Sequence, residues 1–498
     1  MTYPSTVFFI VASARSGSTS LARILDTAAN GTCAVEPMPN LNRETRLAMD
    51  GCLADPMAVV RQTIVPRVQQ QEGDVYGEKN VTYGPFIPHL HQALGCRFVF
   101  LTRDGRDVVR SLVNWHEQKF GTIYRECRDP GHLSPQALKS AASLPVHQDT
   151  SDYARPRPRP GDPLYGAWEH LGRDEMCAYY WSRLNDLYLD RLADLPDDAS
   201  MRINYTSPTA DDVLRVAAFC GLTGLREGVV RKMLDRRINS LSDREAPDGL
   251  YPDWKDWDGG RRRRFDRLAA ATMQRLGYYT DPATRWRPAT YGQWWREHDG
   301  GLDWYRWMYN SRRKMHEDFI AWVRARERAG EPIESLADFG CGLGVGYADA
   351  FADKRYVGVE LSEKNVAWCR ENRDNPNHAY LCRDFVAEPF DEPADVVFSS
   401  GTVDNTYDMD ACLRSMVLSA RKWIYATFYR GWFPHLREHR YAWRPEHHCF
   451  YNDASPRRLR DTLEALGCEA VCVEPVPTGN TDVPFETRVT ARVPAKRT

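Results

Sequence analysis

The feature that most constrains the fold is a buried strand that runs into a tight turn of small residues and then into a helix. Val7–Val11 is continuously apolar, and Ser18–Leu25 has the spacing of an amphipathic helix. A second unit of this kind lies at Arg97–Trp115, where the apolar run Phe98–Leu101 precedes helical spacing from Val108. Two strands that each lead into a helix predict an α/β fold with a parallel sheet.

The alternation of strand and helix starts again in the second half of the chain. Helical spacing from Trp304 to about Arg328 leads into the apolar strand Ser335–Phe339. Residues 282–303 are aromatic, polar and proline-bearing, which is typical of a linker. Because 498 residues exceed what one core usually organises, we predict two α/β domains at 1–281 and 304–498, with a linker at 282–303.

The composition of the chain limits the kinds of partner and cofactor that we expect it to bind. The 66 Lys plus Arg nearly cancel the 68 Asp plus Glu, so no global charge favours nucleic acid or an anionic membrane. Val7–Ala12 is too short to span a membrane and lacks the flanks of a signal peptide. The 13 cysteines form no CxxC pair, and Cys449 beside His447 and His448 is a poor metal cluster because adjacent ligands rarely converge. We expect a cytoplasmic protein with no membrane span and no metal; oligomeric state carries no sequence signal.

The turn after the first strand has the residues of an anion site. Ser13–Thr19 reads SARSGST, and a turn of small residues there points backbone N–H groups and a helix N-terminus at an anion. Arg15 and the hydroxyl groups can complete a phosphate cradle. The lysine and the spacing of a GxxxxGK[ST] loop are absent, which argues against a phosphate-transferring NTPase or kinase. We keep that function as an alternative, together with an ordinary strand-to-helix turn that binds no anion.

The second strand–helix unit adds a matching pair. Arg103 leaves the end of its strand and Ser111 lies on the next helix, eight positions on. Together with the first turn, this pair resembles the sulfotransferases that use 3′-phosphoadenylyl sulfate (PAPS), over roughly residues 6–281. The resemblance implies a P-loop-like parallel-sheet fold. It also implies that the 5′-phosphosulfate is held by Arg15, Ser16, Gly17, Ser18 and Thr19, and the 3′-phosphate by Arg103 and Ser111.

The segment Gly77–Asn80 (GEKN) offers an acid and an amine. Sulfuryl transfer uses a base for the acceptor proton and cations for the leaving phosphate. A GEK motif carries the catalytic glutamate in glycan-type and many bacterial sulfotransferases, so the resemblance implies that Glu78 is the base and that Lys79 and Arg15 contact the phosphosulfate. A surface Glu–Lys pair is the alternative. Ala14 replaces the family's usual proline, and Arg15 stands where several members have lysine, which leaves open a slow or repurposed enzyme or a binding module.

A glycine-rich loop follows the strand Ser335–Phe339. The run from Asp338 to Gly344 reads DFGCGLG, and its glycines let the backbone pass close to a ligand. The next strand, Tyr356–Glu360, ends in an acid 16 positions after Gly344, where a ribose diol would bind. The GxGxxG spacing of nicotinamide enzymes is not met, and such an enzyme remains the alternative.

This set, with Asp384 farther along, resembles class I methyltransferases that use S-adenosylmethionine (SAM). The resemblance covers about residues 302–493 and implies a Rossmann-like fold. It places the cofactor on Asp338, Gly340, Gly342, Glu360 and Asp384.

The acceptor is less constrained. Ser399–Thr402 stands where enzymes that methylate nitrogen carry an NPPY-type signature, so we expect an oxygen acceptor. Side chains that can act as general base follow this strand or lie in the aromatic stretch 432–451, although packing or a surface position is the better explanation of any one of them: Asp404, Asn405, Tyr407, His435, His439, His447 and His448.

We therefore expect a bifunctional enzyme that transfers a sulfuryl group from PAPS and a methyl group from SAM to hydroxyl groups of a small metabolite or glycan. The alternatives are a methyltransferase that carries a degenerate sulfotransferase-like binding module, and a phosphate-transferring N-terminal domain.

Overall fold

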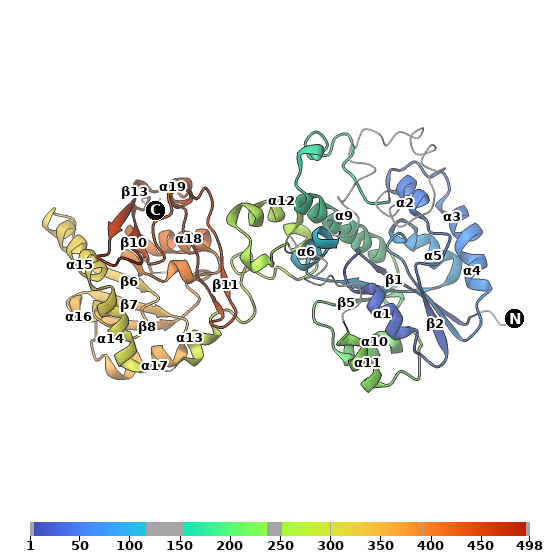
Figure 1. Cartoon of the computed structure of the whole chain (residues 1–498), viewed down its shortest axis with the longest axis horizontal. Coiled ribbons are helices and arrows are strands. Elements are labelled where there is room, and N and C mark those ends of the chain that lie inside the picture. The colour runs from blue at the N-terminus through green and yellow to red at the C-terminus, as the bar shows by residue number, and fades with distance from the viewer. Residues whose placement is uncertain (1–3, 116–153, 237–250, 299, 391, 495–498) are drawn as a thin grey trace. The chain divides into compact units, whose positions relative to one another are not determined.

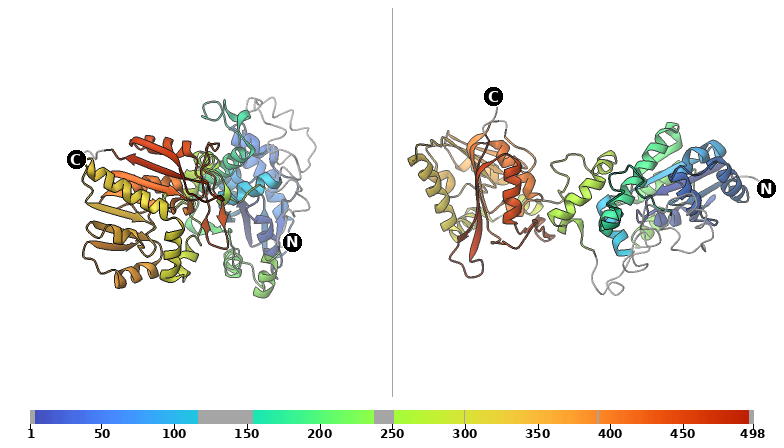
Figure 2. Two further views of the ribbon diagram at one scale, coloured as in Figure 1. Left: turned by 60° about the vertical axis from the view of Figure 1, so that its left-hand side comes forward. Right: turned by 90° about the horizontal axis from the view of Figure 1, so that it is seen from above.

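The computed structural model describes residues 4–115, 154–236, 251–298, 300–390 and 392–494 (Figure 1). The chain forms two compact units (Figure 2). Unit 1 contains Met1–Trp254 and Arg264–Tyr278, and unit 2 contains Lys255–Arg263 and Tyr279–Thr498. None of the helices in the described ranges combines the length and hydropathy needed to cross a bilayer.

Unit 1 is built on a parallel sheet of five strands in the order β2-β3-β1-β4-β5. The strands are β1 (Thr6–Ala12), β2 (Gly31–Val35), β3 (Val75–Lys79), β4 (Arg97–Thr102) and β5 (Ser200–Asn204). The first strand lies in the middle, because β3 and β4 pair with its two edges. The carboxyl ends of β1, β3 and β4 therefore meet at one edge of the sheet.

Helices cover both faces of this sheet. Phe8 and Ile10 of β1 pack with Leu21 of α1 and Val213 of α10 on one face, whereas Phe100 of β4 packs on Tyr188 of α9 at a centroid distance of 5.5 Å on the other. The helices of unit 1 are α1 (Ser18–Leu25), α2 (Asn42–Met49), α3 (Pro56–Val59), α4 (Val65–Gln69), α5 (Ile87–Leu94), α6 (Gly105–Trp115), α9 (Arg173–Ala193), α10 (Ala210–Phe219), α11 (Glu227–Leu234) and most of α12 (Gly259–Arg275).

Unit 2 is built on a sheet of seven strands in the order β13-β14-β10-β9-β6-β7-β8. The strands are β6 (Ser335–Phe339), β7 (Arg355–Glu360), β8 (His378–Cys382), β9 (Ala394–Ser400), β10 (Ala420–Phe428), β13 (Glu469–Pro477) and β14 (Phe485–Arg492). β14 runs antiparallel to β10 and to β13, whereas β10, β9, β6, β7 and β8 pair with one another in parallel. The predicted α/β class with parallel sheets is confirmed in both units.

Helices also cover the sheet of unit 2. Phe319 of α15 and Phe351, which directly follows α16, pack with Phe398 of β9 on one face, and α18 contacts β9 and β10. The helices are α13 (Gln293–Glu297), α14 (Gly301–Ser311), α15 (Arg313–Arg328), α16 (Tyr347–Ala350), α17 (Glu363–Asn372), α18 (Met409–Ser419) and α19 (Pro456–Ala465). A two-stranded hairpin, β11 (Trp443–Arg444) and β12 (Cys449–Phe450), completes the unit.

Two expectations from the sequence differ from the structure. The helix expected over 304–328 is two helices, because Arg312 leaves helical geometry and turns its side chain toward the sheet. The segment 282–303, expected as a linker, belongs to unit 2. It contains α13, and Tyr291 packs edge-on against Tyr407 with ring centroids 4.9 Å apart, so it is part of a packed domain.

Candidate functional site

The glycine-rich loop of unit 2 sits at the carboxyl end of β6. Gly340 and Gly342 have φ values of 85° and 53°, in the left-handed region that favours glycine. A Cβ atom on Gly342 would lie 2.4 Å from the ring of Tyr305, and one on Gly346 would lie 2.1 Å from the ring of Tyr309. These two tyrosines are one helical turn apart on α14, so α14 lies directly on the loop.

Glu360 ends the neighbouring strand β7 and is buried. Its carboxylate accepts hydrogen bonds from the backbone N–H groups of Gly342 (3.0 Å), Leu361 (2.8 Å) and Ser362 (3.2 Å). Burial raises the pKa of the Glu360 carboxyl, and these three N–H donors oppose that shift. The acid is therefore fixed against the glycine loop by its own backbone contacts.

Asp338, the last acid of β6, is also buried. It accepts a hydrogen bond of 2.7 Å from the hydroxyl group of Tyr356. Burial raises its pKa to about 7, the Tyr356 hydrogen bond opposes the shift, and the nearby Glu360 charge adds to it. Two acids thus stand close together beside the loop, and a cation placed there would favour their ionised forms.

Asp384 does not have the surroundings expected for an acid that contacts a bound nucleotide. Its Oδ2 accepts from Arg287 Nη1 (2.9 Å) and from the hydroxyl group of Tyr407 (3.1 Å), and its Oδ1 accepts from the N–H of Val386 (3.2 Å). Asp338, Gly340, Gly342 and Glu360 are among the described residues that line the cavity, together with Phe385, whereas Asp384 is not.

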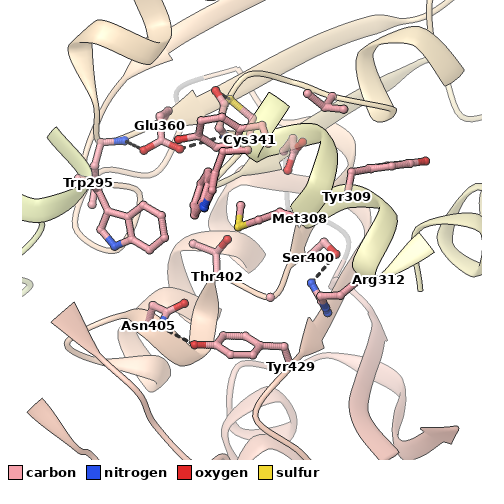
Figure 3. A pocket seen from close by; sticks show the side chains of 18 of the residues that line it. Trp295, Met308, Tyr309, Arg312, Cys341, Glu360, Ser400, Thr402, Asn405 and Tyr429 are labelled. Atoms are coloured by element: carbon pink, nitrogen blue, oxygen red, sulfur yellow. Dashed lines mark hydrogen bonds between the residues drawn. The ribbon is translucent and has the colours of Figure 1, made fainter. Parts of the chain in front are cut away.

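A cavity of about 500 Å³ is lined by the glycine loop, Asp338 and Glu360. Figure 3 shows this cavity from close by, with Glu360 labelled. Tryptophan, tyrosine and phenylalanine supply eleven of its 28 lining residues, so flat aromatic rings are the largest group among its lining side chains. The aromatic part comes from the segment 291–309 and from the residues around the hairpin β11–β12. Trp307 lines the cavity although 64% of the residue is exposed.

A charged cluster closes the inner part of the cavity. Arg312 Nε donates to Glu486 Oε1 (2.9 Å), and its other nitrogens donate to Ser400 Oγ (3.3 Å) and Thr427 Oγ1 (3.0 Å). His316 bonds the hydroxyl group of Tyr347, and burial, aided by the Arg312 charge, lowers the His316 pKa to about 3. The imidazole therefore stays neutral at physiological pH.

Sequence reasoning missed this cluster and most of the aromatic wall. Arg312 and His316 lie 174 and 170 positions before Glu486, and the three residues carry no motif. Of the side chains proposed as a methyl-transfer base, Asn405 and His447 line the cavity, whereas Tyr407 bonds Asp384. Asp404 and His439 are buried, and each accepts a hydrogen bond from a backbone N–H group: Asp404 from that of Arg430 (3.0 Å) and His439 from that of Ser455 (3.1 Å). The cavity is lined by none of Asp404, His435, His439 and His448.

In unit 1 the turn after β1 meets the residues that follow β4. Arg15 Nε donates to Ser111 Oγ (3.1 Å), and Arg103 Nη1 donates to the Arg15 carbonyl oxygen (3.2 Å). Burial and the Arg103 charge lower the Arg15 pKa to about 10. Arg15 and Gly17 have φ values of 68° and 97°, so the turn is wound in the left-handed region.

The hydroxyl residues of the turn take part in its structure. Ser16 bonds Ser13 (Oγ···Oγ 2.7 Å), and α1 begins with Ser18 and Thr19. The structure thus brings together Arg15, Arg103 and Ser111, and two guanidinium groups held this close favour an anion between or beside them.

In the segment Gly77–Asn80, Glu78 does not have the free carboxylate that we expected of a catalytic base. Glu78 is fully buried, and its two oxygens accept from Arg67 Nε (2.8 Å) and Nη2 (2.9 Å), from Tyr76 (3.0 Å) and from Tyr83 (2.5 Å). Lys79 pairs with Glu36, whose side chain is 50% exposed. Glu36 follows β2 and was missed in the sequence, because no local pattern links it to Lys79.

Comparison with known proteins matches residues 337–421 to a family model described as a methyltransferase domain. No curated protein matches the chain. Similar solved structures are magnesium protoporphyrin IX methyltransferase from Synechocystis PCC 6803 with bound SAM (15% identity, 46% of this chain, 98% of that chain, TM-score 0.29) and the N-methyltransferase NodS from Bradyrhizobium japonicum WM9 with S-adenosylhomocysteine (12%, 42%, 100%, 0.30). A third is 1,6-didemethyltoxoflavin-N1-methyltransferase from Burkholderia thailandensis (16%, 36%, 77%, 0.29).

Unit 2 therefore contains a methyltransferase domain, and the matched residues include the glycine loop, Glu360 and the end of β9. The family model covers no part of unit 1.

Proposed function

We propose that unit 2 binds SAM and transfers its methyl group to an oxygen of a small acceptor held in the same cavity. The observation that carries this proposal is that the glycine loop and Glu360 line a cavity that is also lined by aromatic side chains. The methyltransferase family match at 337–421 covers that loop and Glu360.

The residues present fit SAM. Gly340 and Gly342 line the cavity without side chains of their own, and Glu360 places a fixed carboxylate where it can accept from ribose hydroxyl groups. The buried acid Asp338 suits the positive charge of the methionine part. When bound, SAM supplies a methyl group made electrophilic by its sulfonium. The chain's part is to hold the acceptor oxygen in line with that group and to exclude water.

Calorimetry with the full chain tests this. S-adenosylhomocysteine should bind saturably, and Glu360→Gln should weaken binding, whereas Glu363→Gln should not. Glu363 is a matched control because it begins α17, close in the chain to Glu360, and does not line the cavity. Equal affinity of the parent and of Glu360→Gln, or no binding by the folded chain, would refute the proposal.

Unit 1 has a second candidate function, favoured by the convergence of Arg15, Arg103 and Ser111 at the ends of β1 and β4. We propose that residues 1–281 bind a 3′-phosphoadenosine nucleotide, with these three groups on its phosphates and Ser16, Gly17, Ser18 and Thr19 completing the cradle. Sulfuryl transfer from PAPS is the fuller form of this proposal.

The contacts of Glu78 favour binding over turnover. A carboxylate that accepts four hydrogen bonds and is fully buried is a poor acceptor for a substrate proton. Lys79 remains beside the accessible carboxylate of Glu36, so Glu36 and Lys79 are the pair that any turnover would use.

Titration of the full chain with 3′-phosphoadenosine 5′-phosphate separates these cases. Binding that Arg103→Ala weakens at least tenfold and Arg215→Ala leaves unchanged supports the nucleotide site, because Arg215 is an exposed arginine on α10. Incubation of the full chain with PAPS and 2-naphthol then tests for sulfuryl transfer, because turnover would yield the sulfated product. Absence of nucleotide binding would reject both forms of the proposal.

A further inference from the structure

We infer that the acceptor of unit 2 is a flat aromatic ring that carries a hydroxyl group, and that His447, paired with Tyr451, takes the proton of that hydroxyl group. This inference rests on the proposed methyltransferase function and names the substrate class and the general base of the same cavity.

The shape of the cavity favours a flat ring. Trp294, Trp304 and Trp307 line it, and Tyr429, which follows β10, and Tyr451, which follows β12, add further rings. Trp294 and Trp304 pack edge-on with centroids 6.2 Å apart, so they brace one another rather than move independently. Aromatic faces held in this way bind planar ligands by offset or edge-on stacking.

The polar groups of the cavity are largely engaged already. Both hydrogens of the Asn405 amide are used, on the hydroxyl oxygen of Tyr429 (3.1 Å) and on the carbonyl oxygen of Phe450 (2.7 Å). Arg312 is paired with Glu486 and bonds Thr427 and Ser400. A sugar placed there would bring several hydroxyl groups against donors that Arg312 and Asn405 already use, and each buried hydroxyl group left without a partner costs about 1–3 kcal/mol. A ring with a single hydroxyl group avoids that cost.

His447 is held against this space by its neighbours. It lies in the turn between β11 and β12, and its Nδ1 is 2.8 Å from the hydroxyl oxygen of Tyr451. Its ring meets Trp294 edge-on at a centroid distance of 5.5 Å and Tyr451 nearly face-on at 5.6 Å. A tyrosine hydroxyl can accept from Nδ1–H, and this leaves Nε2 with a free lone pair.

The other groups that could take a proton are unsuited to it. Burial and Arg312 lower the pKa of His316 to about 3, so its imidazole is too weak a base. Burial raises the pKa of Cys449 to about 12 and also raises that of Tyr451, so both remain protonated. Asp338 is bonded to Tyr356 beside the glycine loop. Glu360 is held by three backbone N–H groups beside the same loop, so His447 is the base that the described lining residues leave.

The reaction step balances with these groups. The O–H bond of the acceptor breaks and its proton moves to Nε2 of His447. The oxygen forms its bond to the methyl carbon as the carbon–sulfur bond breaks, and the products are a methyl ether, S-adenosylhomocysteine and an imidazolium ion that then loses its proton to water.

The experiment uses the full chain and 2-naphthol as probe. We expect saturable quenching of tryptophan fluorescence by 2-naphthol in the presence of S-adenosylhomocysteine, and 2-methoxynaphthalene when SAM is supplied. His447→Gln should keep both affinities within about threefold and lower turnover at least about 100-fold, the usual worth of a positioned base. Tyr451→Phe should lower turnover by a smaller factor. His435→Gln, an exposed histidine outside the cavity, is the matched control.

Each remaining outcome decides against one proposal. If S-adenosylhomocysteine binds but 2-naphthol neither binds nor is methylated, the acceptor class is wrong while the proposed function stands. Binding of methyl glucoside in place of 2-naphthol leads to the same conclusion. If 2-naphthol is methylated and His447→Gln retains turnover within a few-fold of the parent, His447 is not the base. Failure to bind S-adenosylhomocysteine removes the proposed function itself.

Discussion

Binding of a cationic cofactor to unit 2 should release a proton from Asp338. Without ligand, burial holds the Asp338 pKa near 7, so the carboxyl is mostly protonated below neutrality. A sulfonium and an ammonium group brought to this place favour the carboxylate and lower its pKa toward the ordinary value of about 4. Binding then becomes coupled to the loss of a proton.

The magnitude follows from these two values. With a pKa of about 7 before binding and about 4 after it, Asp338 releases about 0.9 protons at pH 5.5 and about 0.5 at pH 7. The affinity for SAM should rise about 15-fold between pH 5.5 and pH 7. Calorimetry in buffers of different ionisation enthalpy measures both quantities on the full chain.

Variants identify the group responsible. Asp338→Asn should bind SAM more weakly, and the 15-fold dependence on pH should largely disappear. Asp404→Asn is the matched control, because burial also raises the Asp404 pKa to about 7 but Asp404 does not line the cavity. Equal proton release from the parent and from Asp338→Asn at pH 5.5 would refute the reasoning. The same raised pKa means that Asp338 stabilises the free protein at low pH and that this contribution is lost as pH rises through 7.

Three further outcomes are expected. Glu360→Gln should weaken S-adenosylhomocysteine binding about 10- to 100-fold through loss of a charged hydrogen bond; calorimetry measures this, and a change below twofold would contradict it. Gly342→Ala should lower the same affinity at least tenfold, because its Cβ would meet the Tyr305 ring, and the added change Tyr305→Ala should restore part of the loss; no restoration would exclude a steric cause. Glu78→Gln should destabilise unit 1 by about 3 kcal/mol, since Arg67 loses its buried carboxylate; unchanged hydrogen exchange in β3 would oppose this.

The sequence predicted local features better than long-range ones. The glycine loop and Glu360 could be found because a strand, a turn and the next strand follow one another closely in the chain. The break at Arg312 could not, because its cause is an ion pair with Glu486, 174 residues away. Asp384 likewise looked free, since its partner Arg287 lies in a segment whose composition resembles a linker.

Unit 1 shows the same division. The turn Ser13–Thr19 and the spacing of Arg103 and Ser111 are visible in the sequence, and the structure brings Arg15 and Ser111 into contact. The contacts of Glu78 are not visible there, because Arg67 and Tyr83 reach it from other elements. Hydrophobic periodicity reports which face of an element is buried and does not report which polar groups meet across the core.

Helix α14 contacts the glycine loop of unit 2 and also lines the cavity beside that loop. Tyr305 and Tyr309 press on the glycine loop, while Trp307 and Met308, between them in the chain, line the cavity. Changes to either tyrosine would therefore alter the hold on the methyl donor together with the choice of acceptor. Trp307 is different, because its residue is 64% exposed and no glycine of the loop packs against it. A protein engineer who wishes to widen the range of acceptors should begin with this one indole, where selectivity can be retuned at little risk to donor affinity.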